Sequence, residues 1–315
     1  MKQAISIAEV LAEIAVLVKP HFGKGRTAQY IPQLAGVEPT KFGMAVCLVP
    51  RTGRPGGDVE EFAVGDADEP FSAQSITKLF ALGLALNRIG DEVWTRVGKE
   101  PSGTPFNYLS QLEHEEGIPR NPFINPGALA VSDILLDKVR EPDRLVRDFM
   151  SVLSAAELEI DEEVAVSELE TAHKNRAIAN LMRSFGTITH DPETVIEAYC
   201  RQCAVTINCR QLARAALPLA VSGFSPIVGE TIFPQRLTRR LNALLLTCGI
   251  YDSVGSFAYR VGLPAKSGVG GGIVAVVPGQ ATVAVWSPEL DRFGTSVVGA
   301  YALERFSQLT NCSVL

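Results

Sequence analysis

The chain has 315 residues, of which 46% are hydrophobic and 20% are charged, the balance of a folded globular protein rather than a disordered one. This length allows one large domain or two closely joined ones. The formal net charge of -6 argues against a nucleic-acid partner, because proteins bind nucleic acids through basic surfaces.

The N-terminal segment predicts an amphipathic helix of the mature protein rather than a secretory signal. Apolar residues recur at helical spacing from Ile7 to Val18, and Glu9 and Glu13 interrupt what a signal peptide keeps uncharged. No uncharged apolar run elsewhere approaches the roughly 20 residues that a membrane span requires. We therefore expect a cytoplasmic protein with no membrane partner.

The cysteines are expected to be buried thiols. Without an export signal the compartment is expected to be reducing, which disfavours disulfides. Cys200 and Cys203 have zinc-like spacing, but no second cysteine or histidine pair completes four ligands, so no metal site is expected. The six cysteines are Cys47, Cys200, Cys203, Cys209, Cys248 and Cys312.

Strand patterns occur near both ends of the chain. Residues 43–49 and 58–64 predict two strands, and the turn-forming residues 51–57 between them predict a hairpin. Residues 272–277 and 281–286 predict a second hairpin, joined by a Pro-Gly-Gln turn.

Between residue 72 and about residue 240 the periodicity is helical. Residues 75–88 are apolar nearly all round, which is typical of a helix in the middle of a core. The other expected helices span residues 126–139, 142–153, 175–184, 191–203, 208–221 and 297–309.

This order predicts an α/β (α+β) fold with one antiparallel sheet built from both chain ends and flanked by helices. Within a single domain of residues 1–315, residues 1–70 and 245–315 are expected to form a sheet lobe and residues 71–244 a helical lobe. We expect a ligand-binding cleft where the two lobes meet.

Ser75 and Lys78 are the first candidates for chemistry. Three-residue spacing on a helix places the hydroxyl and the amine on one face, one turn apart. Lys78 is followed by an apolar segment, and a lysine desolvated at a helix start can lose its proton and activate a hydroxyl. The backbone N–H of Ser75 would also be free to stabilise an oxyanion. The alternative is a capping serine with a solvated lysine.

Lys266-Ser267-Gly268 gives a second motif, just ahead of a glycine-rich strand entry. A Lys-Ser/Thr-Gly strand accompanies Ser-x-x-Lys in serine acyl-transfer enzymes related to penicillin-binding proteins. The third motif of those enzymes is missing, because Ser132-Asp-Ile134 lies inside an expected helix and lacks the amide. A cell-wall or β-lactam substrate is therefore disfavoured.

Several ordered segments together resemble the serine-dependent glutaminases along nearly the whole chain. The resemblance implies a fold like that of β-lactamases and penicillin-binding proteins, hydrolysis of the glutamine side-chain amide, and no metal or organic cofactor. The matching segments are residues 30–35, 74–78, 101–103, 106–107, 121–127, 167–168, 175–179, 251–252 and 264–269.

The resemblance also implies a set of site residues. With the two motifs, it leads us to expect Ser75 as the nucleophile, Lys78 as the general base, and the N–H groups of Ser75 and Val269 as the oxyanion donors. We expect either Lys78 or Tyr251 to protonate the leaving ammonia. The residues implied to bind L-glutamine are Tyr30, Ser75, Asn125, Glu168, Asn175, Tyr199, Tyr251 and Val269.

These residue types suit an amino-acid ligand. Glu168 can pair with an α-ammonium, while Asn125, Asn175 and Tyr199 can orient an α-carboxylate. Each also has a structural alternative: Asn125 as a helix cap, Glu168 on a solvated face and Tyr199 in the core.

Two departures from the family pattern are expected to tune activity without abolishing it. Lys174 stands where the resemblance leads us to expect Arg, and Thr77 stands where a second Ser is common. The chain ends at Leu315 without the ankyrin-type repeats of the animal enzymes, so phosphate activation of their kind is not expected.

Two alternative functions remain open beside this interpretation. The alternatives are a β-lactam-reactive serine hydrolase on the same fold and a non-catalytic sensor of glutamine or glutamate. The resemblance implies a homodimer or a homotetramer.

Overall fold

The computed structural model describes residues 6–50, 59–103, 109–137 and 141–315. Its main sheet is antiparallel, with strand order β2-β1-β10-β9-β8 and Gly43 opposite Trp286 in the register of β1 and β10. The prediction of a sheet built from both chain ends is confirmed, while the turn at 51–57 lies outside the described residues. The strands are β1 (Gly43–Leu48), β2 (Glu61–Gly65), β8 (Ala265–Ser267), β9 (Gly272–Val277) and β10 (Ala281–Trp286).

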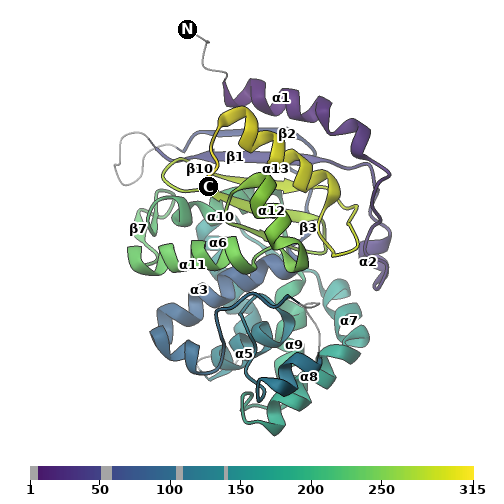
Figure 1. Ribbon diagram of the computed structural model, residues 1–315, viewed down its shortest axis with the longest axis vertical. Helices are drawn as coiled ribbons and strands as arrows, with labels where there is room; N and C mark the ends of the chain where they lie inside the picture. The colour runs from purple at the N-terminus through teal and green to yellow at the C-terminus, as the bar shows by residue number, and fades with distance from the viewer. Residues whose placement is uncertain (1–5, 51–58, 104–108, 138–140) are drawn as a thin grey trace.

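Both faces of this sheet are covered by helices. Alternate residues of β1 point to opposite faces, so that Met44 and Val46 join one buried cluster and Ala45 and Cys47 another. The face of Met44 packs against the N-terminal helix α1 and the C-terminal helix α13, which cross the sheet in Figure 1. The opposite face packs against α10. Because neither face meets water, β9 and β10 are apolar at almost every position.

The helices that cover the sheet lie far apart in the sequence. The predicted amphipathic helix near the N-terminus is present as α1, which begins with a capping box in which Ser6 and Glu9 satisfy each other's backbone N–H groups. These covering helices are α1 (Ile7–Leu17), α10 (Cys209–Ala220), α12 (Val254–Val261) and α13 (Val297–Thr310).

The remaining helices form the other part of the molecule, and among them α3 runs through the middle (Figure 1). All side chains from Thr77 to Leu86 are buried, which confirms the prediction of a helix surrounded by core. The helix α3 packs against α5 and α6, and α5 packs against α9. These helices are α3 (Thr77–Ile89), α5 (Asn125–Leu136), α6 (Pro142–Ser154), α7 (Glu162–Thr171), α8 (His173–Ser184), α9 (Pro192–Cys203) and α11 (Gln235–Cys248).

Short elements complete the described chain. The strand β3 (Phe71–Ser72) leads into a 3-10 turn, η2 (Gln74–Ile76), and β3 pairs with β5 in a small sheet of order β3-β5-β4. The others are α2 (Pro32–Ala35), α4 (Leu109–His114), β4 (Glu159–Ile160), β5 (Val205–Ile207), β6 (Phe224–Ser225), β7 (Glu230–Thr231) and the 3-10 turns η1 (Lys19–His21), η3 (Gly90–Thr95) and η4 (Tyr251–Ser253).

The structure differs from the sequence-based elements in three places. Ser75 lies in the 3-10 turn η2, and the α-helix itself begins at Thr77. The helices α7, α11 and α12 were not separately predicted, and α7 buries only Val164 and Ala165, which leaves a weak apolar period in the sequence. The expected lobe boundary after residue 244 falls inside α11, and the division into two lobes stays a prediction.

The cysteines, the possible metal ligands and the helices were compared with the expectations from the sequence. All six cysteines are buried free thiols. Within residues 6–50, 59–103, 109–137 and 141–315, no His, Cys, Asp and Glu side chains gather in threes as metal ligands would. Among the same residues, every helix falls short of the length and apolarity needed to cross a bilayer.

Trp286, at the end of β10, packs against β3, the strand that precedes η2 and α3. Its loss should therefore destabilise the fold. Its ring is 2% exposed and stacks on Phe71 with the ring centroids 5.4 Å apart. We expect Trp286→Ala to lower the free energy of unfolding by about 3–5 kcal/mol in chemical denaturation. The control Tyr259→Ala removes an aromatic ring that is 92% exposed, and should change it by less than about 0.5 kcal/mol. Equal effects of the two changes would contradict this account.

Candidate active site

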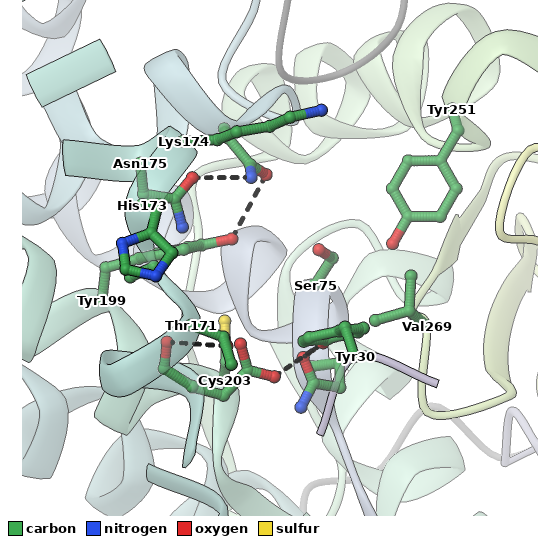
Figure 2. A pocket seen from close by; sticks show the side chains of 14 residues that line it. Tyr30, Ser75, Thr171, His173, Lys174, Asn175, Tyr199, Cys203, Tyr251 and Val269 are labelled. Carbon is green, nitrogen blue, oxygen red and sulfur yellow. Dashed lines mark hydrogen bonds between the residues drawn. The ribbon is translucent and has the colours of Figure 1, made fainter. Parts of the chain in front are cut away.

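A pocket of about 460 Å³ opens at the N-terminal end of α3 and is also lined by residues of α7, α8 and α9 and by Tyr30 (Figure 2). This volume suits a ligand of the size of an amino acid. The structure brings to its wall every residue that the sequence suggested for substrate binding: Tyr30, Ser75, Asn125, Glu168, Asn175, Tyr199, Tyr251 and Val269.

Ser75 and Lys78 lie at the buried side of this pocket. Ser75 is 7% exposed and its hydroxyl lines the cavity, while Lys78, one turn further on, is 3% exposed. The Lys78 ammonium nitrogen Nζ donates to the Phe123 carbonyl at 3.2 Å and to Asn125 Oδ1 at 2.8 Å. No hydrogen bond joins it to Ser75 within the part of the chain that the structure describes.

Burial changes the protonation of Lys78. Its Nζ atom also lies 5.5 Å from the ring centroid of Tyr199, and no carboxylate is among its hydrogen-bond partners. Desolvation of the charged form lowers the pKa of Lys78 from 10.5 to about 8. A neutral amine has two N–H donors, and both are used by Phe123 and Asn125, which leaves the lone pair to accept a proton.

The segment of Val269 is held against the turn that carries Ser75. A Cβ on Gly268 would lie 2.6 Å from the Ala73 carbonyl oxygen, and a Cβ on Gly270 would lie 2.3 Å from that of Ser72, so only glycine permits this approach. The Trp286 indole donates to the Gly270 carbonyl at 3.0 Å and fixes the segment from the other side.

Ser75 and Val269, which carry the two candidate backbone donors, line the same pocket. Ser75 comes from η2, and Val269 comes from the turn between β8 and β9. Neither N–H takes part in a backbone hydrogen bond among the described residues. Such a pair of N–H groups can stabilise an oxygen that becomes negatively charged during a reaction.

Tyr251 points its hydroxyl toward Ser75 and Val269 (Figure 2). Its side chain is 9% exposed. Burial raises the pKa of Tyr251, and hydrogen bonding with Ser75, Ser267 and the Val269 backbone acts against that rise. The phenol therefore stays protonated at neutral pH and can act as a proton donor. Its φ of +36° is strained for a side-chain-bearing residue, and such strain is common in functional sites.

One side of the pocket is acidic. The Tyr30 hydroxyl donates to Glu168 Oε1 at 2.6 Å and lies 3.4 Å from Gln74 Oε1. Burial raises the pKa of Glu168, while hydrogen bonds from Tyr30 and Gln74 favour its ionised form. Glu168 thus faces the cavity rather than a solvated surface, and it can pair with a ligand ammonium.

The opposite side is built from amides and a phenol. Asn125 Nδ2 donates to Asn175 Oδ1 at 3.0 Å, and the Tyr199 hydroxyl donates to Asn125 Oδ1 at 3.3 Å (Figure 2). Asn125 is at the first position of α5 and makes no capping hydrogen bond, so it does not act as the helix cap that the sequence left open. Tyr199 is 5% exposed, and its hydroxyl nevertheless reaches the cavity wall.

Sequence reasoning missed part of the wall. The residues before Asn175 belong to the start of α8, and the cation Lys174, noted only as a departure, lies across the pocket (Figure 2). His173 and Lys174 could have been predicted, because they share the first turn of α8 with Asn175. Gln74 could have been predicted because it is the neighbour of Ser75. The unassigned wall residues are Gln74, Thr171, Ala172, His173, Lys174 and Cys203.

The remaining sequence features do not lie in the described pocket wall. Ser132 donates to Gln202 Oε1 at 3.3 Å inside the core, and Asp133 accepts hydrogen bonds from Arg96 and His190, so this motif lies outside the pocket. Residues 106–107, part of the resemblance, lie outside the described residues.

The chain closely resembles known proteins over its full length. Residues 25–315 match the sequence profile of the family described as Glutaminase. A glutaminase of Caulobacter vibrioides (strain NA1000 / CB15N) is 74% identical over 313 residues, which cover 99% of this chain and 100% of the relative.

Solved structures agree with that match. The probable glutaminase ybaS superposes with a TM-score of 0.89 at 32% identity, covering 98% of this chain and 99% of the other. A probable glutaminase from Bacillus subtilis, complexed with 6-diazo-5-oxo-L-norleucine, superposes with a TM-score of 0.86 at 32% identity, covering 100% of this chain and 98% of the other. The chain therefore belongs to the glutaminase family, the serine-dependent enzymes with a β-lactamase-like fold.

Proposed function

We propose that this enzyme hydrolyses the side-chain amide of L-glutamine to L-glutamate and ammonia through a γ-glutamyl ester on Ser75. The observation that carries the proposal is a serine hydroxyl at the floor of an amino-acid-sized pocket, one turn from a buried lysine whose pKa is about 8. The bound 6-diazo-5-oxo-L-norleucine of the Bacillus subtilis relative, a glutamine analogue, supports the same substrate class.

In the first step the Ser75 oxygen attacks the amide carbon while Lys78 accepts the hydroxyl proton. The hydrogen bonds to Phe123 and Asn125 use both N–H donors of the neutral amine. Its lone pair is then available to accept the proton of Ser75. The N–H groups of Ser75 and Val269 then hold the carbonyl oxygen, and each such donor contributes on the order of 3 kcal/mol to the transition state.

The leaving nitrogen departs as ammonia after it gains a proton. Tyr251, whose phenol stays protonated and points at Ser75, is placed to donate this proton, and protonated Lys78 can return it to the phenol. Water then attacks the ester carbon, with Lys78 again as the base, and glutamate leaves with Ser75 restored.

The two sides of the pocket divide the recognition of the amino-acid group. Glu168, held by Tyr30, pairs with the α-ammonium, while Asn125, Asn175 and Tyr199 orient the α-carboxylate. We also propose, from the family resemblance alone, a cytoplasmic homodimer or homotetramer.

Replacement of the nucleophile should stop turnover without disturbing the fold. We expect Ser75→Ala to lower ammonia release from L-glutamine at least about 10⁴-fold, while glutamate still binds and the melting temperature is unchanged. The matched control is Ser132→Ala, which removes a buried hydroxyl outside the pocket and should leave kcat within about twofold. Near-normal turnover by Ser75→Ala would exclude the proposed nucleophile. Labelling of the wild type by a penicillin, without ammonia from glutamine, would favour the β-lactam-reactive alternative.

The protonation of Lys78 predicts the pH dependence. Because the base must be neutral and its pKa is about 8, kcat/KM should rise roughly tenfold per pH unit at lower pH and level off above about 8. Ammonia release measured between pH 6 and pH 9.5 tests this sign. A profile that is flat below pH 7.5, or that falls as pH rises through 8, would contradict a lysine base.

The role of Glu168 predicts a selective loss of affinity. We expect Glu168→Gln to raise KM for L-glutamine about 10–100-fold, because a charge-assisted contact to the α-ammonium is lost. The same change should affect N-acetyl-glutamine hydrolysis by less than about threefold. The matched control Glu170→Gln neutralises an exposed carboxylate on the same helix and should change neither. An equal loss for both substrates in Glu168→Gln would argue against the ammonium contact.

A further inference from the structure

The proposed reaction leaves one fully buried amine without a role. Lys266 on β8 is 0% exposed, and its Nζ atom donates to the Ser267 carbonyl at 2.6 Å and to the Gly249 carbonyl at 3.1 Å. Both partners are neutral oxygens rather than carboxylates. A buried lysine held in this way is costly, and burial together with the nearby Lys78 pushes the pKa of Lys266 well below its usual value. An apolar residue of similar volume would fill the same space at lower cost.

The contacts of Lys266 converge on Tyr251. Its Nζ atom lies over the Tyr251 ring, 4.7 Å from the ring centroid. The carbonyl of Gly249 that it binds belongs to the residue two positions before Tyr251, at the end of α11. The amine therefore holds both the ring of Tyr251 and the chain that leads into it.

Tyr251 needs such support. Its φ of +36° is strained, and strained backbone persists only where the surroundings fix it. The Ser267 N–H also donates to the Gly249 carbonyl, at 3.3 Å, so this carbonyl receives hydrogen bonds from β8 twice. On its other side, Lys266 Nζ lies 5.8 Å from the ring centroid of Phe123, the residue whose carbonyl accepts from Lys78.

We infer that Lys266 is a positioning residue of the reaction, which locks the ring and backbone of Tyr251 against β8 so that the phenol hydroxyl meets Ser75 and Val269. The inference rests on the proposed role of Tyr251 as proton donor. A donor displaced by a fraction of an ångström loses much of its effect, so the loss of Lys266 should appear in kcat rather than in substrate affinity.

A double-mutant cycle tests the inference. Lys266→Met keeps the side-chain volume and removes the amine with its N–H donors, whereas Tyr251→Phe keeps the ring and removes the hydroxyl. We expect Tyr251→Phe to lower kcat about 100-fold. Lys266→Met should lower kcat about 10–30-fold with KM for L-glutamine changed less than about threefold. In the Tyr251→Phe background, where no hydroxyl remains to be placed, Lys266→Met should cost less than about threefold.

A matched control exists in the chain. Lys99 Nζ also lies 4.7 Å from an aromatic ring centroid, that of Trp94, but Lys99 lies outside the pocket wall. Lys99→Met should leave kcat within about twofold. If Lys266→Met fails to fold, as judged by circular dichroism and glutamate binding, Lys266→Leu, which also lacks the donors, takes its place in the same cycle with the same criteria.

Two results would overturn the inference, and they are distinguishable from each other. An equal loss from Lys266→Met in both backgrounds, or no loss in either, would show that Lys266 does not act through Tyr251, with the proposed chemistry intact. Full activity of Tyr251→Phe would instead remove Tyr251 from the proposed reaction, and the positioning role of Lys266 with it.

Discussion

The proposed chemistry of this enzyme depends on an amine, that of Lys78, which is buried without a carboxylate partner. Lys78 is enclosed by α3, the Phe123 carbonyl, Asn125 and the ring of Tyr199. A carboxylate in the same place would stabilise the ammonium and make the lysine a poor base. Neutral oxygens accept its hydrogens without favouring the charge as strongly, so desolvation decides the outcome and the pKa falls to about 8.

The fold supplies both the burial and the second half of the site. Ser75 comes from the helical part of the chain, whereas Val269 and Lys266 come from the edge of the sheet, nearly two hundred positions later. The close approach of Gly268 and Gly270 to the chain before Ser75 joins these parts. A side chain at either glycine would push the segment of Val269 away from the turn of Ser75, so the proposed oxyanion site depends on this close approach.

The polar groups of the pocket are divided between two sides. Glu168 and Tyr30 form an acidic side, and Asn125 and Asn175 form a side whose amides can donate or accept hydrogen bonds. Ser75 lines the same pocket. An α-amino acid has two charged groups at one end and its reactive amide at the other. The arrangement therefore fits a free amino acid with a side-chain carbonyl. The position of Glu168 would set the orientation of this amino acid in the pocket.

Much of this could be predicted from the sequence because it rests on local patterns. The alternating apolar segments near both ends determine strands, the glycine and proline turns determine hairpins, and the all-apolar segment after Ser75 determines a central buried helix. The Ser75–Lys78 spacing likewise indicates a candidate nucleophile and a candidate base, because residues three apart on a helix lie on one face.

Other features were decided only by the tertiary structure. No local pattern tells that Lys266 lies against the ring of Tyr251, or that Lys174 and Cys203 reach the pocket wall, because these contacts join segments far apart in the chain. The same holds for the pKa of Lys78, which depends on what surrounds it rather than on its neighbours in sequence. The sequence by itself determined which groups are available and their local spacing. The packing of distant segments decided their burial and orientation, because desolvation and hydrogen bonding are properties of the folded surroundings.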